Sequence, residues 1–230
     1  MESQDMVNKN VKNNEQKSGT KAALSHTLCH YWKDHKNSKI YIPFLLLLLT
    51  YGALYVLFNS LVHIDTQLFL EIFKMRNPAL DAFFVLLTNG GSFFFIFFVV
   101  LVLWLKGERS PAVYLAAGLI ADLVFVTALK TMIHRPRPYE SLSITPLELG
   151  DIFGSLPSGH ASRAFLSAMI LTKFYRKYMV IFFLMAASIG FSRVYLGAHY
   201  PLDVIIGAIN GVLSGILIIN LCDRFRWRKG

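Results

Sequence analysis

Charged side chains are scarce in this chain. Asp, Glu, Lys and Arg make up 16% of its 230 residues, and hydrophobic residues make up 54%. A typical soluble domain has about 25% charged residues. In water, the present composition would expose large apolar patches, so a lipid bilayer is the better solvent. The composition therefore predicts an integral membrane protein and argues against a soluble globular domain.

Cysteine is also rare, which excludes several kinds of site. Cys29 and Cys222 lie near opposite ends of the chain, and no C-x-x-C motif is present. The chain therefore offers neither a disulfide framework nor a cysteine-based zinc site. His26, His30 and His35 lie close to Cys29, but their spacing matches no standard metal motif. We interpret this segment as solvated and amphipathic, and we expect no metal and no cofactor.

Acidic residues are fewer than basic ones, with 14 against 23, so the formal net charge is +9. A basic balance can indicate nucleic-acid binding. Here, however, the charges form short clusters between long apolar runs, which is typical of the segments that flank membrane spans. We therefore expect the bilayer, and no nucleic acid, as the partner of this chain.

The long apolar runs predict an all-α integral membrane bundle of six transmembrane helices, since a span needs about 20 apolar residues. The predicted spans are 40–62, 93–105 extended at an angle by 82–88 across a break at 89–92, 111–130, 158–172, 179–196 and 202–221. The stretch 65–76 is amphipathic, so we expect it to lie in the membrane interface. Residues 1–38 form a polar, partly disordered tail, and residues 39–230 form the membrane domain.

The distribution of Lys and Arg predicts the orientation of these spans. Sixteen of the 23 basic residues fall on the side of the amino terminus, and seven fall on the opposite side. Because cytoplasmic segments carry an excess of Lys and Arg, we expect both termini in the cytoplasm. The protein would be a multi-pass component of the cell membrane, and the ends of the spans opposite the termini, with any active site formed there, would face outward at the membrane–water interface.

Three polar stretches stand at the outer ends of the predicted spans: residues 130–138, 157–160 and 192–203. In an up-and-down bundle, these ends meet on one face. They contribute the cations Lys130, Arg137 and Arg193, for which the sequence shows no matching set of nearby carboxylates. Ionisable groups in membrane segments are costly and usually functional. An anion with several oxygens, such as phosphate, would neutralise these cations.

The same stretches contain groups that are suited to phosphate chemistry. Ser158 and Gly159 stand at a helix start, where backbone amides and the helix dipole favour phosphate, and glycine allows a close approach. His199 and Asp203 are four residues apart, so a carboxylate can fix the tautomer of the ring and leave its other nitrogen to attack. His160 is placed to protonate the leaving oxygen.

The three stretches resemble the signature of the type 2 phosphatidic acid phosphatase superfamily, which reads K-x6-R-P, then P-S-G-H, then S-R-x5-H-x3-D. The motifs cover residues 130–203, and the span pattern extends the resemblance to about 40–222. The resemblance implies a phosphohistidine on His199, with Asp203 orienting that ring and His160 as the acid. It implies these phosphate ligands: Lys130, Arg137, Ser158, Gly159 and Arg193. It implies no metal, because fixed cations stabilise the charge.

Three further polar residues lie near the signature without belonging to it. Arg135 has the wrong spacing from Lys130, and we interpret it as a contact to a lipid headgroup or a loop. Arg163 lies one helical turn from His160, where it could touch the substrate or pair with an acidic loop residue. Asp122 lies inside the third predicted span. Hydrogen bonding between helices and a substrate or proton role both remain open for it.

The resulting functional hypothesis is a membrane lipid phosphatase that hydrolyses a lipid phosphate or pyrophosphate. A polyprenyl pyrophosphate, such as a cell-envelope carrier lipid, is favoured by the small size of the chain and the outward site. Phosphatidic acid and phosphatidylglycerol phosphate are alternatives. A lipid phosphotransferase that passes phosphate to an alcohol would share the phosphohistidine. A lipid transporter or scramblase is disfavoured, because the sequence shows no internal repeat and no second polar cluster at the midplane.

Overall fold

The computed structural model describes residues 39–54, 56–58, 60–149 and 152–227, and all regular structure within them is helical. The predicted tail of residues 1–38 lies outside the described residues, and so its boundary stays a prediction. The chain divides into two units, Met1–Ile42 and Pro43–Gly230, and every element named from α2 onward belongs to the second unit. An apolar helix, Lys39–Leu54, leads into this unit, and residues 60–74 form the next long helical stretch.

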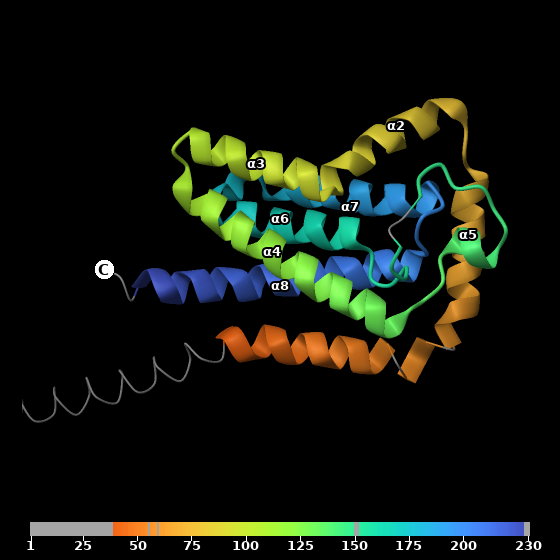
Figure 1. Cartoon of the computed structure of the whole chain (residues 1–230), viewed down its shortest axis with the longest axis horizontal. Helices are drawn as coiled ribbons and strands as arrows, with labels where there is room; N and C mark the ends of the chain where they lie inside the picture. Colours follow the sequence, from red (N-terminus) through yellow and green to blue (C-terminus); the bar gives the residue numbers. More distant parts are fainter. Residues whose placement is uncertain (1–38, 55, 59, 150–151, 228–230) are drawn as a thin grey trace, which may run out of the picture. The chain divides into compact units, whose positions relative to one another are not determined.

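The remaining elements agree closely with the predicted spans (Figure 1). They are α2 (Pro78–Thr88), η1 (Asn89–Gly91), α3 (Phe93–Leu105), α4 (Arg109–Ile133), α5 (Pro138–Ser141), α6 (Gly159–Phe174), η2 (Arg176–Tyr178), α7 (Met179–Tyr195) and α8 (Pro201–Trp227). The helices α4, α6, α7 and α8 begin and end within a few residues of the predicted bounds, except that α8 extends six residues further. The helical stretch 60–74 covers most of the predicted amphipathic segment.

The predicted break inside the second apolar run is confirmed. The helices α2 and α3 meet at η1 with a bend of 57°. The side chain of Ser92 caps α3 by accepting a hydrogen bond from the backbone N–H of Phe95 at 3.1 Å. Gly91 lets this bend approach the start of α6, because a Cβ there would lie 2.9 Å from the carbonyl oxygen of His160. The bend therefore packs directly beside a predicted site residue.

Three helices in the described part of the chain are long and apolar enough to cross a membrane, namely Arg109–Ser141, Arg176–Tyr195 and Pro201–Phe225. The bent pair of α2 and α3 would make a fourth span. By contrast, α6 has 16 residues, and Lys39–Leu54 is also short. The described part of the chain is thus all-helical with three or four candidate spans, while the six-span count and the outward site stay predictions.

Close packing of α8 against α6 brings the starts of these two helices together. Gly207, Gly211 and Gly215 repeat every four residues, so they form one stripe along α8. A Cβ on Gly207 would lie 2.6 Å from the carbonyl oxygen of Ser158, so only glycine permits this approach. Small residues at this spacing commonly let membrane helices pack backbone to backbone. As a result, the N–H of Ser158 donates to the carbonyl oxygen of Asp203 at 2.9 Å.

Candidate active site

The ends of α4 and α7 and the starts of α6 and α8 lie at the same end of the bundle (Figure 1). All residues of the predicted site lie there: Lys130 in the last turn of α4, Arg137 preceding α5, Ser158, Gly159 and His160 at the start of α6, Arg193 in the last turn of α7, His199 before α8 and Asp203 in its first turn. The structure therefore brings together residues that are up to 73 positions apart in the sequence. Their chemical roles stay predictions.

The site is unusually rich in buried charge. Lys130, Arg137, Arg193, His199 and Asp203 each expose 3% or less of their surface. Burial of an ionised side chain is costly unless it is paired and hydrogen-bonded. Such a cluster is therefore expected only where surrounding groups, or a charged ligand, stabilise it.

His199 lies between a carboxylate and a guanidinium. Its Nδ1 is 3.5 Å from Oδ2 of Asp203, and its Nε2 is 3.4 Å from Nη1 of Arg137. The first distance is within ion-pair reach, although it is longer than a usual N–H···O hydrogen bond. Oδ2 of Asp203 also accepts from the N–H of Tyr200 at 2.9 Å. The ring thus directs one nitrogen to Asp203 and the other to the cation of Arg137.

Arg137 is held in place by backbone oxygens around it. Nη1 donates to the carbonyl oxygen of Ala198 at 3.1 Å, and Nη2 donates to that of Phe153 at 3.4 Å. The backbone N–H of Arg137 donates to Oε2 of Glu140 at 2.7 Å, which anchors the turn on which this side chain stands. The guanidinium plane is therefore oriented by several elements at once.

The surroundings of Arg193 differ from the expectation that the site cations have no nearby carboxylates, because a carboxylate lies beside this residue. Its Nη1 donates to Oε2 of Glu148 at 2.6 Å and to Oγ1 of Thr88 at 2.9 Å. This pair could not be predicted from the sequence, because Glu148 is 45 residues away from Arg193. The loop between α5 and α6 folds back to the end of α7 and closes that separation. The expectation of cations without nearby carboxylates was therefore wrong for Arg193.

The start of α6 also differs in detail from the expectation. The backbone amide of Ser158 is occupied by the carbonyl oxygen of Asp203, so it does not point outward to a ligand. The hydroxyl of Ser158 is buried, and it has no hydrogen-bond partner within the described residues. A Cβ on Gly159 would lie 3.1 Å from Nη1 of Arg163, whose Nε donates to the carbonyl oxygen of Gly91. Ser158 therefore offers a hydroxyl group rather than an amide.

Arg135 is the clearest correction to the sequence analysis. We expected a contact to a headgroup or loop, but Arg135 is buried with 6% exposure. Its Nη1 donates to Oδ1 of Asp203 and its Nη2 donates to Oδ2 of Asp65, both at 2.6 Å. The chain leaves α4 through His134, whose φ of 52° is left-handed, and the next residue turns inward. Spacing from Lys130 could not reveal this direction.

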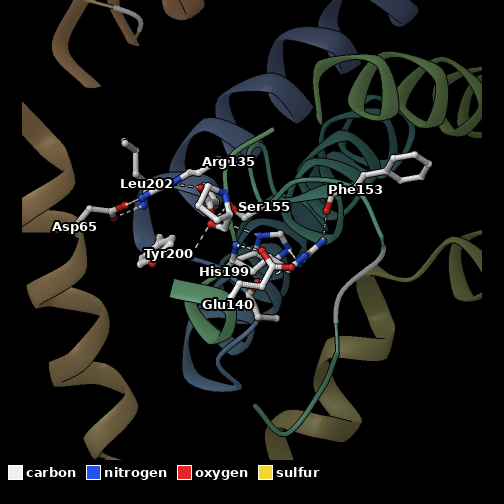
Figure 2. Close-up of polar contacts among 12 residues, drawn as sticks. Asp65, Arg135, Glu140, Phe153, Ser155, His199, Tyr200 and Leu202 are labelled. Atoms are coloured by element: carbon white, nitrogen blue, oxygen red, sulfur yellow. Dashed lines mark hydrogen bonds and ion pairs between the residues drawn. The ribbon is translucent and has the colours of Figure 1, made fainter. Parts of the chain in front are cut away.

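Asp65 is a site residue that sequence reasoning missed. It belongs to the helical stretch 60–74, and its Oδ1 accepts from the N–H of Leu202 at 2.7 Å (Figure 2). Burial raises the pKa of Asp65, although hydrogen bonds from Arg135 and Leu202 and the charge of Arg135 act in the opposite direction. A lone carboxylate directly after an apolar run was the signal that could have marked it.

Asp122 takes part in hydrogen bonding between helices. The hydroxyl of Ser162 donates to Oδ1 of Asp122, and Nδ2 of Asn210 donates to that hydroxyl oxygen at 2.8 Å. These contacts join α4, α6 and α8 inside the bundle. Of the two alternatives that the sequence left open for Asp122, the structure thus supports the structural one.

The described part of the chain contains no group of three or more His, Cys, Asp or Glu residues placed to hold a metal ion. The groups that converge at the site are mainly cations and imidazoles, together with the hydroxyl of Ser158. Such a set can bind a multivalent oxyanion and present a ring nitrogen to it.

Residues 111–227 match the family model described as the PAP2 superfamily, and this region includes every residue of the predicted site. The chain belongs to the PAP2 superfamily. The superfamily assignment makes it a membrane phosphatase of a metal-independent class that acts on lipids. The resemblance found in the sequence motifs is thereby confirmed.

Two curated relatives match between about half and two thirds of this chain. Undecaprenyl-diphosphatase BcrC of Bacillus subtilis is 29% identical over 168 residues, which cover 68% of this chain and 85% of BcrC. Lipid A 1-phosphatase of Rhizobium etli is 37% identical over 123 residues, which cover 46% of this chain and 52% of that protein. This chain thus matches only about half of the length of the second relative.

A solved structure shows the same fold. It is the transmembrane PAP2 type phosphatidylglycerolphosphate phosphatase of Bacillus subtilis, with a TM-score of 0.67 and 24% identity. The match covers 81% of this chain and 97% of that protein. The helices that carry the candidate site are therefore arranged as in a transmembrane phosphatase.

Proposed function

We propose that this protein hydrolyses a lipid phosphate or pyrophosphate through a phosphohistidine intermediate on His199. The observation that carries this proposal is the position of the His199 ring. Its Nδ1 faces Asp203 and its Nε2 faces Arg137, at 3.5 and 3.4 Å. A phosphoryl group held by Arg137 would thus lie next to the nitrogen that is not directed to the carboxylate.

The proposed phosphate ligands are Lys130, Arg137, Ser158, Gly159 and Arg193. Their charges and donors would stabilise the oxygens of the phosphoryl group as it is transferred, as a metal ion does in other phosphoryl-transfer enzymes. The carboxylate of Glu148, now 2.6 Å from Arg193, would give way to a substrate oxygen. The hydroxyl of Ser158 would donate to another oxygen.

The reaction would proceed in two steps. Nε2 of His199 attacks phosphorus while the bond from phosphorus to the leaving oxygen breaks, and His160 gives its proton to that oxygen. The negative charge of Asp203 stabilises the positive ring that results. A water molecule then attacks phosphorus and gives a proton to His160, the nitrogen–phosphorus bond breaks, and inorganic phosphate leaves.

The favoured substrate is a polyprenyl pyrophosphate. Its support is the similarity to undecaprenyl-diphosphatase BcrC, which extends over 68% of this chain, together with the predicted outward site. A second candidate is a lipid A phosphate, supported by the higher identity of 37% to lipid A 1-phosphatase over a shorter region. Both substrates carry a phosphate on a large lipid at the membrane surface.

A substrate panel tests this proposal. Purified protein in detergent would receive undecaprenyl pyrophosphate, lipid A, phosphatidic acid and phosphatidylglycerol phosphate, each with a metal chelator, and released phosphate would be measured. We expect the highest kcat/KM on undecaprenyl pyrophosphate, undiminished by chelation, and no release by the His199→Ala variant.

Other outcomes of the panel have defined meanings. A clear preference for lipid A would select the second candidate. A phosphorylated alcohol in place of inorganic phosphate, after addition of an alcohol acceptor, would indicate a phosphotransferase. Absence of phosphate release from every lipid would overturn the proposed function.

A further inference from the structure

A buried chain of three charges lies behind His199. Arg135 bridges two carboxylates, with 2.6 Å to Oδ1 of Asp203 and 2.6 Å to Oδ2 of Asp65. Each of these three side chains exposes 5% or less of its surface. The guanidinium of Arg135 also lies 4.2 Å from the centre of the Tyr200 ring, which fixes its plane further.

The second oxygen of each carboxylate contacts the segment that carries His199 (Figure 2). Oδ2 of Asp203 accepts from the N–H of Tyr200 at 2.9 Å. Oδ1 of Asp65 accepts from the N–H of Leu202 at 2.7 Å. Asp65 therefore ties the helical stretch 60–74 to the start of α8 and, through Arg135, to the carboxylate next to His199.

The charges of this chain suit a carboxylate that must stay ionised while buried. Without Arg135, Oδ1 of Asp203 would lose a charged donor, and burial would favour the protonated form, which is a weaker partner for an imidazole. Asp65 balances the charge of Arg135 and holds its second nitrogen. Two carboxylates and one guanidinium leave one net negative charge beside the His199 ring.

We propose that Arg135 and Asp65 are positioning residues of the reaction: Arg135 keeps Asp203 ionised, and Asp65 holds Arg135 in place, so that Asp203 stays oriented against Nδ1 of His199. This inference rests on the proposed role of His199 as the nucleophile. Neither residue belongs to the signature motifs. They act through Asp203, and they do not contact the phosphoryl group.

The planar guanidinium of Arg135 is needed for this positioning role because its two terminal nitrogens donate to two carboxylates at once. The Arg135→Lys variant keeps the positive charge but cannot hold both oxygens in the same way. We therefore expect a loss of activity in this variant, contrary to what a headgroup contact would predict. This expectation reverses the one that the motif spacing suggests for Arg135.

The main test replaces Asp65 by Asn. The Asn side chain keeps an oxygen that can accept from the N–H of Leu202, but it lacks the negative charge that pairs with Arg135. The probe is p-nitrophenyl phosphate, an activated ester whose use does not depend on the identity of the lipid substrate. We expect kcat and the rate of phosphoenzyme formation to fall by about 10- to 100-fold, the loss seen when the carboxylate partners of metal-binding histidines are removed, with little change in KM.

Glu71→Gln provides the matched control, because Glu71 is an exposed carboxylate on the same helical stretch and pairs only with Lys74 among its described contacts. We expect this variant to keep wild-type kcat. Thermal unfolding in detergent is measured for every variant. A loss of kcat in Asp65→Asn at an unchanged unfolding temperature separates positioning from general stability.

A double-variant cycle with Asp203→Asn gives the second readout. If Asp65 acts through Asp203, removing Asp65 costs little more once Asp203 has lost its charge, so the two effects are not additive. Fully additive losses, a loss confined to KM, or a kcat of Asp65→Asn equal to that of wild type would overturn the proposed positioning role. If the wild type forms no phosphoenzyme and hydrolyses neither this ester nor any lipid, the proposed function itself fails.

Discussion

At the residue scale, the two arginines of the Arg135-Pro136-Arg137 segment serve different partners. Arg135 contacts two carboxylates at 2.6 Å each. Arg137 contacts the carbonyl oxygens of Ala198 and Phe153 and the ring of His199. The same residue type therefore stabilises a carboxylate in one case and faces the proposed phosphoryl position in the other. Identity alone does not decide the role of an arginine, because the role follows from its neighbours.

Substitution of His199 and substitution of His160 should impair different steps of the reaction. His199→Ala removes the proposed nucleophile, so it should form no phosphoenzyme from any substrate. His160→Ala removes only a proton donor, so its loss, about 10²- to 10⁴-fold, should be greater on alkyl monoesters than on p-nitrophenyl phosphate, which has a better leaving group. Rapid quenching with radiolabelled substrate measures both effects. Formation of a phosphoenzyme by His199→Ala would contradict the assigned roles. So would an equal loss of activity of His160→Ala on alkyl monoesters and on p-nitrophenyl phosphate.

The planar shape of Arg137 should matter as much as its charge. Arg137→Lys should lower kcat/KM by about 10²-fold or more, because a point charge cannot replace a fork that contacts several oxygens. Steady-state kinetics on the best lipid of the panel measures this loss. Arg109→Lys is the control, since Arg109 is exposed at the opposite end of α4. Equal activity of the two variants would remove Arg137 from the phosphate ligands.

At the element scale, the site depends on how closely α6 and α8 approach. The glycine stripe of α8 lets the start of α6 lie against the start of α8, where Ser158 and Asp203 share a backbone hydrogen bond of 2.9 Å. The bend between α2 and α3 adds a third element, since Gly91 lies against His160. Glycine at these positions therefore determines distances within the site, although no glycine side chain takes part.

Gly211→Ala should destabilise the bundle. A Cβ at Gly211 would collide with the backbone of α6, including the N–H nitrogen of Leu166 at 2.9 Å, so the helices must separate. We expect a cost of about 1–3 kcal/mol, as for other overpacked cores, and a parallel loss of activity. Gly52→Ala is the control, because nothing lies within 4 Å of a Cβ there. Thermal unfolding in detergent measures both, and equal unfolding temperatures would contradict this account of the packing.

At the scale of the whole molecule, the asymmetry of Lys and Arg predicts which end of the bundle faces the cytoplasm. Sixteen of 23 basic residues fall on the amino-terminal side of the predicted spans. The seven others include all the cations of the site. The numerous basic residues on the amino-terminal side thus predict the orientation, while three of the seven on the predicted outer side, Lys130, Arg137 and Arg193, lie in the candidate site.

Cysteine labelling tests this orientation. Ser143→Cys, a nearly isosteric change in the exposed loop between α5 and α6, would be made in a chain with Cys29 and Cys222 replaced by Ser. We expect an impermeant thiol reagent to label it in intact cells. Lys106→Cys, at the exposed end of α3, should be labelled only after the cells are opened. The opposite pattern would reverse the topology.

Much of this architecture could be predicted from local sequence. The break at residues 89–92 was predictable because Asn, Gly and Ser interrupt an apolar run, and the structure shows a 57° bend there. The start of α6 at Ser158 and Gly159 was predictable from the same kind of signal. The membrane-class phosphatase assignment followed from three motifs in order, and the family match confirms it.

The sequence by itself determined the membrane environment, the positions of the helices and the type of chemistry, because the length of apolar runs, helix-breaking residues and motif spacing are local properties. The tertiary structure alone decided which charges meet. Glu148 reaches Arg193 across 45 residues, and Asp65 reaches Arg135 across 70. Such pairs form because buried charges must find partners of opposite sign wherever the packing of helices and loops places them, and spacing along the chain carries no record of that packing.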